Sequence, residues 1–287
     1  GLACEPNRVS LQVLGSGGPE LNDQRASSSY LIWINNKATL LVDTGTGSAI
    51  NFEKAGAHFR DIQAILYTHL HVDHSADLPA YVKGSYFISR EDLSIYGPKG
   101  NPLMPSTSEF INLLFGDQGA YRYLSNFVDP AKKSDYKILV NDVELIRDKF
   151  TNFTLSDEIS ITAVPVNHGP VAAIAWRVNA YGCSLTFSGD MSNRFNTLVE
   201  LATDSHILIA HNAIPEHAKG VARLLHMPPS EIGKIANDAN VKMLILSHQM
   251  KRTIGKEAET VAIIHKYYDG PVEFAGDMDL FELNYSE

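Results

Sequence analysis

The stretch Thr68-His69-Leu70-His71-Val72-Asp73-His74 decides how the rest of this sequence is interpreted. It follows directly on the apolar run 62–67, which is typical of a buried strand. Three imidazoles and one carboxylate within six residues are hard to justify structurally, because each would need costly burial or a partner of its own. Binding of metal ions satisfies all four groups at once, so the stretch predicts a metal site rather than a surface cluster of histidines.

The spacing of these ligands suggests how ions would be divided among them. In an extended or turning segment His69 and His71 lie on one face, so both can reach a single ion. Asp73 and His74 come round a turn toward a second ion. Nitrogen and carboxylate ligands without thiolates suit Zn²⁺, with Mn²⁺ or iron as alternatives.

Composition places the chain among ordinary globular proteins. Of its 287 residues, 44% are hydrophobic and 20% are charged, so a packed core is expected. The formal net charge of −9 repels polyanions and counts against nucleic acid as a partner. The sequence contains no apolar run of about 18 residues, so no membrane span is expected.

The order of apolar runs indicates the architecture. Strands are expected at 9–14, 30–34, 39–42, 62–67, 159–164, 172–178, 184–188, 207–210, 243–247 and 272–274. Helices are expected at 75–83, 109–115, 194–202, 230–240 and 256–268. Early strands follow one another as hairpins and later strands alternate with helices. We therefore expect an α/β (α+β) fold in which two mixed sheets pack together under outer helices.

The whole chain, 1–287, is interpreted as a single domain. Between about 84 and 157 the pattern weakens, and Gly97-Pro98-Lys99-Gly100 gives a loop signal. This segment is interpreted as an insertion that covers the active site. Its many aromatic side chains are expected mainly to pack the insertion onto the body of the protein.

The histidine-rich stretch resembles the HxHxDH signature of the metallo-β-lactamase superfamily. Three further short motifs, each after an expected strand, look like the remaining ligands of that family in the family's order. They are Asn167-His168-Gly169, Ser188-Gly189-Asp190 and Ser247-His248. Asp43, in Asp43-Thr44-Gly45, matches the family's Asp-x-Gly turn, whose carboxylate orients a ligand from behind.

This resemblance implies the family's four-layer αββα sandwich, with two divalent metal ions, usually zinc, held by loops at the strand ends. The implied ligands are His69, His71 and His168 for the first ion, Asp73, His74 and His248 for the second, and Asp190 as the bridge. A hydroxide shared by the two ions would be the nucleophile, because coordination lowers the pKa of water by several units.

Other motifs are similar to the ribonuclease Z and arylsulfatase-like branch of the superfamily. They are Leu14-Gly15-Ser16-Gly17-Gly18-Pro19, Arg25 with Ser27-Ser28-Ser29, and Ile95-Tyr96-Gly97-Pro98. The chain departs from the branch at Asn212, which follows His211 where the branch often has glutamate, and at Met227, which follows His226. His226 is a candidate general acid or substrate contact, and Asp73 a candidate to orient the hydroxide. The roles of His211, Glu216 and Arg252 are left open.

The function that fits this branch best is hydrolysis of a phosphodiester in a small molecule. The alternatives are hydrolysis of another ester, as by an arylsulfatase, a lactonase or a β-lactamase-type enzyme. A non-enzymatic alternative is metal-dependent binding or sensing, against which the intact ligand set argues. Processing of transfer RNA is the family precedent, but the acidic charge and the missing His-Glu pair weigh against it.

The first residues, Gly1-Leu2-Ala3-Cys4, would suit the end of a cleaved signal peptide. A periplasmic or secreted protein is one expectation, and a cytoplasmic protein with a trimmed N-terminus is the other. If the protein is exported, Cys4 and Cys183 are expected to pair and to tie the N-terminal segment to the second half. The sequence leaves open whether the protein is a monomer or a homodimer.

Overall fold

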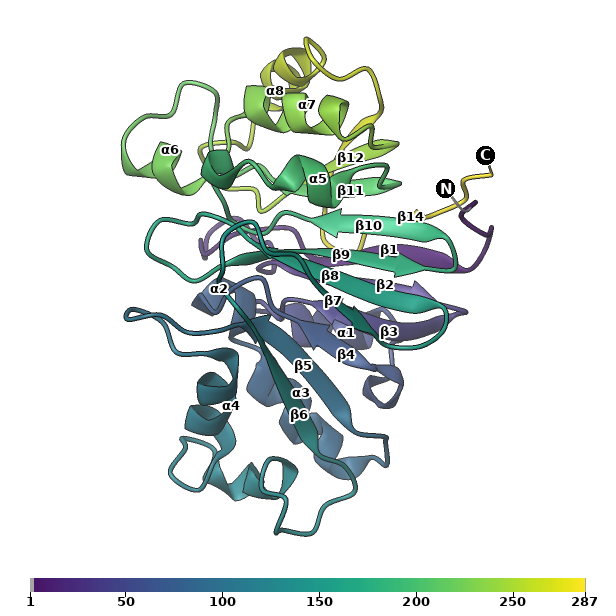
Figure 1. Cartoon of the computed structure of the whole chain (residues 1–287), viewed down its shortest axis with the longest axis vertical. Coiled ribbons are helices and arrows are strands. Elements are labelled where there is room, and N and C mark those ends of the chain that lie inside the picture. The colour runs from purple at the N-terminus through teal and green to yellow at the C-terminus, as the bar shows by residue number, and fades with distance from the viewer. Residues whose placement is uncertain (1–2, 287) are drawn as a thin grey trace.

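The computed structural model describes residues 3–286, which form two seven-stranded mixed sheets packed face to face with helices on their outer sides (Figure 1). The first sheet has the order β14-β1-β2-β3-β4-β5-β6, and the second has the order β13-β12-β11-β10-β9-β8-β7. This arrangement confirms the predicted four-layer αββα sandwich.

The strands of the first sheet are β1 (Val9–Gly15), β2 (Ser29–Ile34), β3 (Lys37–Val42), β4 (Ala64–Leu66), β5 (Leu93–Pro98), β6 (Ile138–Val143) and β14 (Leu280–Glu282). Those of the second are β7 (Thr151–Thr154), β8 (Ile159–Pro165), β9 (Ile174–Ala180), β10 (Cys183–Phe187), β11 (Ile207–His211), β12 (Met243–Ser247) and β13 (Val272–Phe274). The helices are α1 (Ser48–Lys54), α2 (Val72–Ser75), α3 (Leu78–Gly84), α4 (Thr107–Phe115), α5 (Leu198–Ala202), α6 (Val221–Leu225), α7 (Pro229–Asp238) and α8 (Glu257–Ile264).

Apolar residues on both faces of the strands explain the four layers. In β4, Ile65 packs into a cluster beneath the helices of the first sheet, whereas its neighbour Leu66 packs between the two sheets. The second sheet follows the same rule, because Leu244 faces its helices and Ile245 faces the first sheet. Successive side chains of a strand point to opposite faces, so strands that are apolar throughout must be covered on both sides.

The structure differs from the expected elements where local signals are weak. The helix expected at 75–83 is divided into α2 and α3. The stretch 84–157 supplies β5 and β6 to the first sheet and β7 to the second, with α4 and the 3₁₀ helix Arg122–Phe127 between β5 and β6. That this stretch covers the active site stays a prediction.

The two edges of the sandwich differ in what they carry. Parallel strands β10, β11 and β12 all end at one edge, which is where loops follow β4, β8 and β10 with the expected ligands. Ligand sites in sheets of this kind lie outside the carboxyl ends of the strands. At the opposite edge, Cys4 and Cys183 form a disulfide that joins the N-terminal segment to β10, as the pairing hypothesis predicted. Gly1 and Leu2, part of the expected processing signal, lie outside the described residues.

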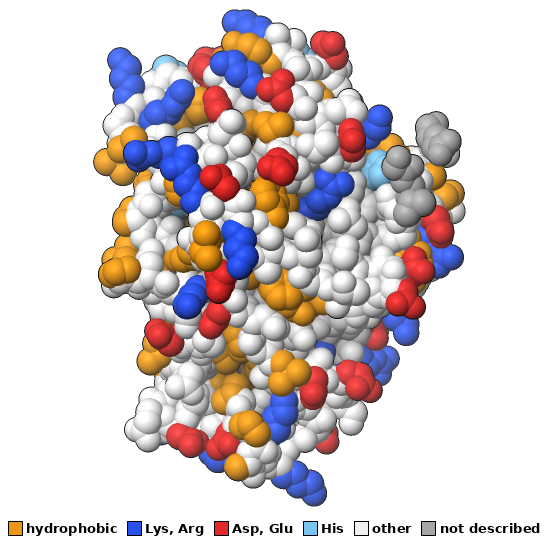
Figure 2. Space-filling model, in the orientation of Figure 1, with side chains coloured by type: hydrophobic (Ala, Val, Ile, Leu, Met, Phe, Trp, Pro, Cys, Tyr) orange, Lys and Arg blue, Asp and Glu red, His pale blue; other side chains and the backbone are white. Residues whose placement is uncertain are grey.

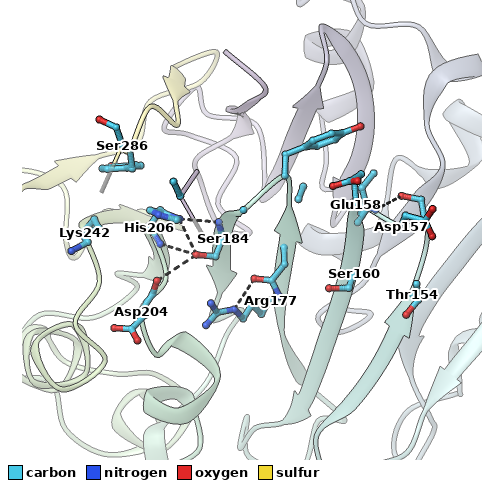
Figure 3. Close-up of a pocket in the computed structure, with 18 of the residues that line it drawn as sticks. Thr154, Asp157, Glu158, Ser160, Arg177, Ser184, Asp204, His206, Lys242 and Ser286 are labelled. Atoms are coloured by element: carbon cyan, nitrogen blue, oxygen red, sulfur yellow. Dashed lines mark hydrogen bonds between the residues drawn. The ribbon is translucent and has the colours of Figure 1, made fainter. Parts of the chain in front are cut away.

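A cavity of about 950 Å³ lies at this opposite edge (Figure 3). Several of its polar groups are paired with one another or with the main chain. The Ser184 backbone N–H donates to His206 Nδ1 at 3.1 Å, and the His206 ring stacks on Tyr285. Arg177 donates to the carbonyl oxygens of Leu201 and Thr203 at 2.9 and 2.6 Å. These contacts stabilise the edge of the second sheet.

Within residues 3–286, no helix is long and apolar enough to cross a bilayer.

Candidate metal centre

Seven side chains from both sheets converge at the edge where the parallel strands end. One group is His69, His71, His168 and Asp190, and the other is Asp73, His74, His248 and Asp190. In each group the potential ligand atoms lie within 4.8 Å of one another. The structure therefore brings together every ligand that the sequence predicted, and Asp190 belongs to both groups.

The distances around Asp190 resemble those between ligands of a common ion. Asp190 Oδ2 lies 3.2 Å from both His74 Nε2 and His248 Nε2. The same oxygen lies 3.5 Å from His69 Nε2 and 3.7 Å from His168 Nε2. Two ligands at tetrahedral positions around one Zn²⁺ ion, each about 2.0–2.1 Å from it, are about 3.3–3.4 Å apart. One carboxylate oxygen thus faces four imidazole nitrogens at distances suited to shared ions.

Unsatisfied atoms at His248 indicate that the cluster fits metal ions. Both ring nitrogens of His248 are buried and make no hydrogen bond, although Asp73 Oδ2 lies only 3.3 Å from Nε2. A buried polar atom without a partner costs free energy, so such atoms are rare in native proteins. A cation among Nε2, Asp73 and Asp190 would satisfy the nitrogen and both carboxylates. Two His/Asp clusters of this kind are consistent with a dinuclear metal site.

Asp43 orients His74 from behind the cluster. Its Oδ2 lies 2.7 Å from His74 Nδ1 and accepts a hydrogen bond from Thr68 Oγ1, also at 2.7 Å. Its Oδ1 accepts from the Thr68 backbone N–H at 2.8 Å. A proton held on His74 Nδ1 leaves Nε2 free to face the site. This is the role predicted for Asp43, which adopts a left-handed φ of 61°.

Two other histidines are fixed by similar contacts. His168 Nδ1 lies 2.9 Å from the carbonyl oxygen of Leu225, so its Nε2 faces Asp190. His211, whose role the sequence left open, holds Asp190, because its Nδ1 lies 2.5 Å from Asp190 Oδ1. His211 Nε2 lies 3.2 Å from the Tyr30 hydroxyl, which donates to Ser247 Oγ. His211 thus positions the shared carboxylate from the side away from the cluster.

The electrostatics of the cluster favour cations. Burial would raise the pKa of Asp190, but His248 and His74 hold it well below its ordinary value. Burial likewise acts to raise the pKa of Asp73. The effect of His74 and His248 is larger, so the pKa of Asp73 is lowered overall. Both carboxylates are therefore ionised at neutral pH and can compensate the charge of bound metal.

Comparison with known proteins agrees with this geometry. The family model described as the metallo-beta-lactamase superfamily matches residues 22–229. The chain belongs to the metallo-beta-lactamase superfamily. Its sequence is 27% identical to that of ribonuclease Z from Mycobacterium sp. (strain KMS) over 294 residues, which covers 96% of each protein.

Solved structures share the superfamily fold with this chain. The metallo-beta-lactamase fold protein YhfI from Bacillus subtilis matches with a TM-score of 0.74 and 21% identity. The match covers 96% of this chain and 99% of that one. The short form of human tRNase Z matches with a TM-score of 0.72 and 18% identity, covering 95% and 98% of the two chains.

Within this superfamily fold, His226 lies beside both ligand groups. It follows α6, and its ring centroid lies 5.4 Å from that of His168 and 6.0 Å from that of His248. Burial lowers the pKa of His226 to about 3, although the negative charge of Asp190 acts to raise it. Its Nδ1 is buried and has no hydrogen-bond partner. His226 is thus a neutral imidazole next to the candidate centre, and its buried Nδ1 is unpaired.

The residues left open near His226 have different environments. The carboxylate of Glu216 accepts from the Ser230 backbone N–H at the start of α7, at 2.9 Å. Asn212 is buried, and its Oδ1 has no partner. Arg252 is exposed and donates from Nε to the carbonyl oxygen of Ala213 at 2.6 Å.

Sequence reasoning missed the partners that hold these groups. Thr68 and Ser247 each directly precede a ligand, so their positions could have drawn attention to them. Tyr30 gave no such signal, because it begins an ordinary apolar run. The carbonyl oxygen of Leu225 is a backbone group, which no side-chain pattern can indicate.

Proposed function

We propose that this protein is a dinuclear metal-dependent hydrolase that cleaves phosphodiesters. The observation that carries the proposal is the position of Asp190 Oδ2, which faces imidazole nitrogens of both ligand groups at 3.2–3.7 Å. His69, His71 and His168 would hold one divalent ion, Asp73, His74 and His248 the other, and Asp190 both. Zn²⁺ suits these donors best, with Mn²⁺ or iron as alternatives.

When bound, two such ions would lower the pKa of a shared water and stabilise the charge that develops on the substrate. Asp73 would orient that water, because its Oδ2 lies at the centre, between His74 and His248. His226, neutral and beside both groups, would donate a hydrogen bond to a substrate oxygen or assist the leaving group. His211 and Asp43 would keep Asp190 and His74 in place during turnover.

The relative named ribonuclease Z supports phosphodiester chemistry, because ribonucleases cleave phosphodiesters of RNA. We propose a small molecule rather than RNA as the substrate. The chain carries a net charge of −9, and a buried asparagine, Asn212, stands where the branch often has glutamate. A polyanion would meet no general electrostatic attraction from such a protein.

A substrate panel tests this function. Zinc-loaded protein would be assayed against bis-p-nitrophenyl phosphate, p-nitrophenyl sulfate, a simple lactone, nitrocefin and a precursor transfer RNA, with chelator-treated protein as the control. We expect metal-dependent turnover of the phosphodiester. Turnover of only the sulfate, the lactone or nitrocefin would show that the fold acts on another ester, and turnover of only the RNA would contradict the small-molecule assignment. A protein that binds metal but turns over nothing would be a binding or sensing protein.

We further propose that the protein works in an oxidising compartment, the periplasm or the extracellular space. Disulfides persist in such compartments and are rare in the cytosol. The Cys4–Cys183 disulfide supports this assignment. Mass measurement of protein purified from its native source without reductant is expected to find no free thiol, and two free thiols would contradict the proposal.

A further inference from the structure

Several large apolar side chains are exposed on segments that surround the metal centre. Their exposed fractions are 91% for Leu21, 74% for Val72, 70% for Val221, 63% for Leu224 and 60% for Leu103. Isolated exposed apolar residues are normal on protein surfaces, but a group of them at one place marks an interaction site. We call these five residues the apolar rim.

Contacts of the main chain place the helical part of the rim at the centre. Val72 lies between the ligands His71 and Asp73. Val221 and Leu224 belong to α6, whose last residue, Leu225, accepts the hydrogen bond from His168 Nδ1. The side chain of Leu225 also lies against the loop that carries His168, because a Cβ added at Gly169 would meet it at 2.6 Å.

The other two members lie in loops that contact the same ligands. Leu21 is three residues after Gly18, where an added Cβ would come within 2.7 Å of His248 Cε1. Leu103 is in the loop after β5, and Asn101 of this loop donates to the carbonyl oxygen of Pro170 at 2.9 Å. Pro170 is two residues beyond His168. Four separate segments thus extend apolar side chains outward from around the two ligand groups.

In helix α6, packing against the core does not account for the exposed apolar side chains. None of its five residues is buried, so the core does not determine the apolar character of Val221 and Leu224. These two residues are three positions apart and therefore share one face of the helix. Gly220, with a positive φ of 68°, directly precedes the helix.

Cations accompany this apolar surface. Lys219 and Arg223 flank the apolar face of α6, and neither forms an ion pair within residues 3–286. Figure 2 shows hydrophobic and basic side chains next to each other at the upper left margin, where Figure 1 places α6. Apolar and basic groups beside a candidate site for phosphodiesters complement a molecule that has an anionic and an apolar part.

We propose that the substrate is an amphipathic phosphodiester, whose phosphate lies at the ligand groups and whose alkyl or acyl chain lies on the apolar rim. This inference rests on the proposed phosphodiesterase function and assigns its substrate class. The residues Val221 and Leu224 set the preference for the chain, because their burial on binding removes apolar surface from water. Lys219 and Arg223 attract the negative charge.

Two diesters with one leaving group test the assignment. Zinc-loaded protein would be assayed with methyl p-nitrophenyl phosphate and decyl p-nitrophenyl phosphate, below the concentration at which the decyl ester forms micelles. We expect the kcat/KM of the decyl ester to be at least about tenfold higher. The double variant V221S/L224S should remove most of this preference through KM and leave the methyl ester within about twofold. The control L139S changes an exposed leucine at the start of β6 and should keep the preference.

Binding provides a second measurement that does not depend on turnover. Calorimetry with decyl phosphate and methyl phosphate should show tighter binding of the decyl compound, and V221S/L224S should abolish the difference. If neither diester is hydrolysed but this binding preference is found, the phosphodiesterase function fails while the assigned ligand class stands. Equal kcat/KM for both diesters, or a preference that V221S/L224S leaves unchanged, would overturn the inference.

A membrane is the competing occupant of the rim. Sedimentation with phosphatidylglycerol vesicles distinguishes it from a single substrate molecule. If V221S/L224S loses vesicle binding while the wild type shows no preference between the dispersed diesters, the rim is a membrane-binding surface and the inference is wrong.

Discussion

The two halves of the metal centre share Asp190 but differ in charge. The first candidate ligand set is His69, His71 and His168, and the second candidate ligand set is Asp73, His74 and His248. In the first set, burial lowers the pKa of all three histidines. In the second set, burial acts in the same direction on His74 and His248, but the surrounding carboxylates raise both pKa values, that of His248 to about 9.

This difference shows two ways of preparing ligands. The first set keeps its imidazoles neutral by removing them from water, so their lone pairs are available to an ion at neutral pH. The second set keeps positive charge at its imidazoles because carboxylates surround them, so a metal ion would replace protons there. The first set thus depends on burial, and the second set depends on Asp43, Asp73 and Asp190.

Substitution of Asp190 should impair metal binding by both ligand sets at once, and it has the largest expected effect on metal content and activity. Because its Oδ2 faces both sets, D190A is expected to lower metal content from two ions to fewer than one per chain. Activity should then fall by about 10³-fold or more. Elemental analysis and diesterase assays check this, with D238A, an exposed carboxylate on α7, as the control. A D190A protein that keeps two ions would contradict the bridging role.

Loss of His226 should affect neither ligand set and yet slow turnover. Its ring lies beside both sets, but it belongs to neither group of ligand atoms. H226A is therefore expected to bind two ions with unchanged affinity and to lose about 10²-fold in kcat. The control is H217A, which changes an exposed histidine in the connection between β11 and α6. An unchanged kcat would reduce His226 to a structural residue.

The seven residues that cluster in the structure are the seven that the sequence predicted as ligands, because each lies after an apolar strand in a motif that resembles one of the family. His168, Asp190 and His248 are far apart in sequence, but the strands before them end at one edge of the sandwich. Local order along the chain is therefore sufficient to predict which side chains cluster, once the family resemblance is recognised.

The contacts that hold the ligands could not be predicted in the same way. The link from Tyr30 to His211 joins the first sheet to the second, and its residues are 181 positions apart. The edge strand β6 has mostly exposed or partly exposed residues, so it lacks the apolar run that reveals a buried strand. α6 buries none of its residues, and no core periodicity marks it.

Substitution of Asp43 should change the metal affinities of the two ligand sets to different extents. Asp43 contacts His74 directly and reaches His69 only through Thr68. D43N is therefore expected to weaken binding of one ion by about 10–100-fold and to affect the other less. H71A provides the matched control, because it removes a ligand of the first set and should weaken the other ion. Competition with a chromophoric chelator measures both affinities. Equal weakening of both ions in D43N would show that the two sets are coupled through Asp190 and do not respond separately.

The smallest effect on the metal centre is expected from the disulfide, which lies at the opposite edge of the sandwich. The double variant C4S/C183S removes a link between residues 179 positions apart, so the free energy of unfolding should fall by about 2–4 kcal/mol. Metal content should stay at two ions, because no ligand contacts either cysteine within the described hydrogen bonds. Denaturant unfolding and elemental analysis of the same samples measure the two quantities. A variant that lost metal before it lost its fold would show that the covalent link at one edge supports ligand geometry at the other, and the two edges could then no longer be treated as independent.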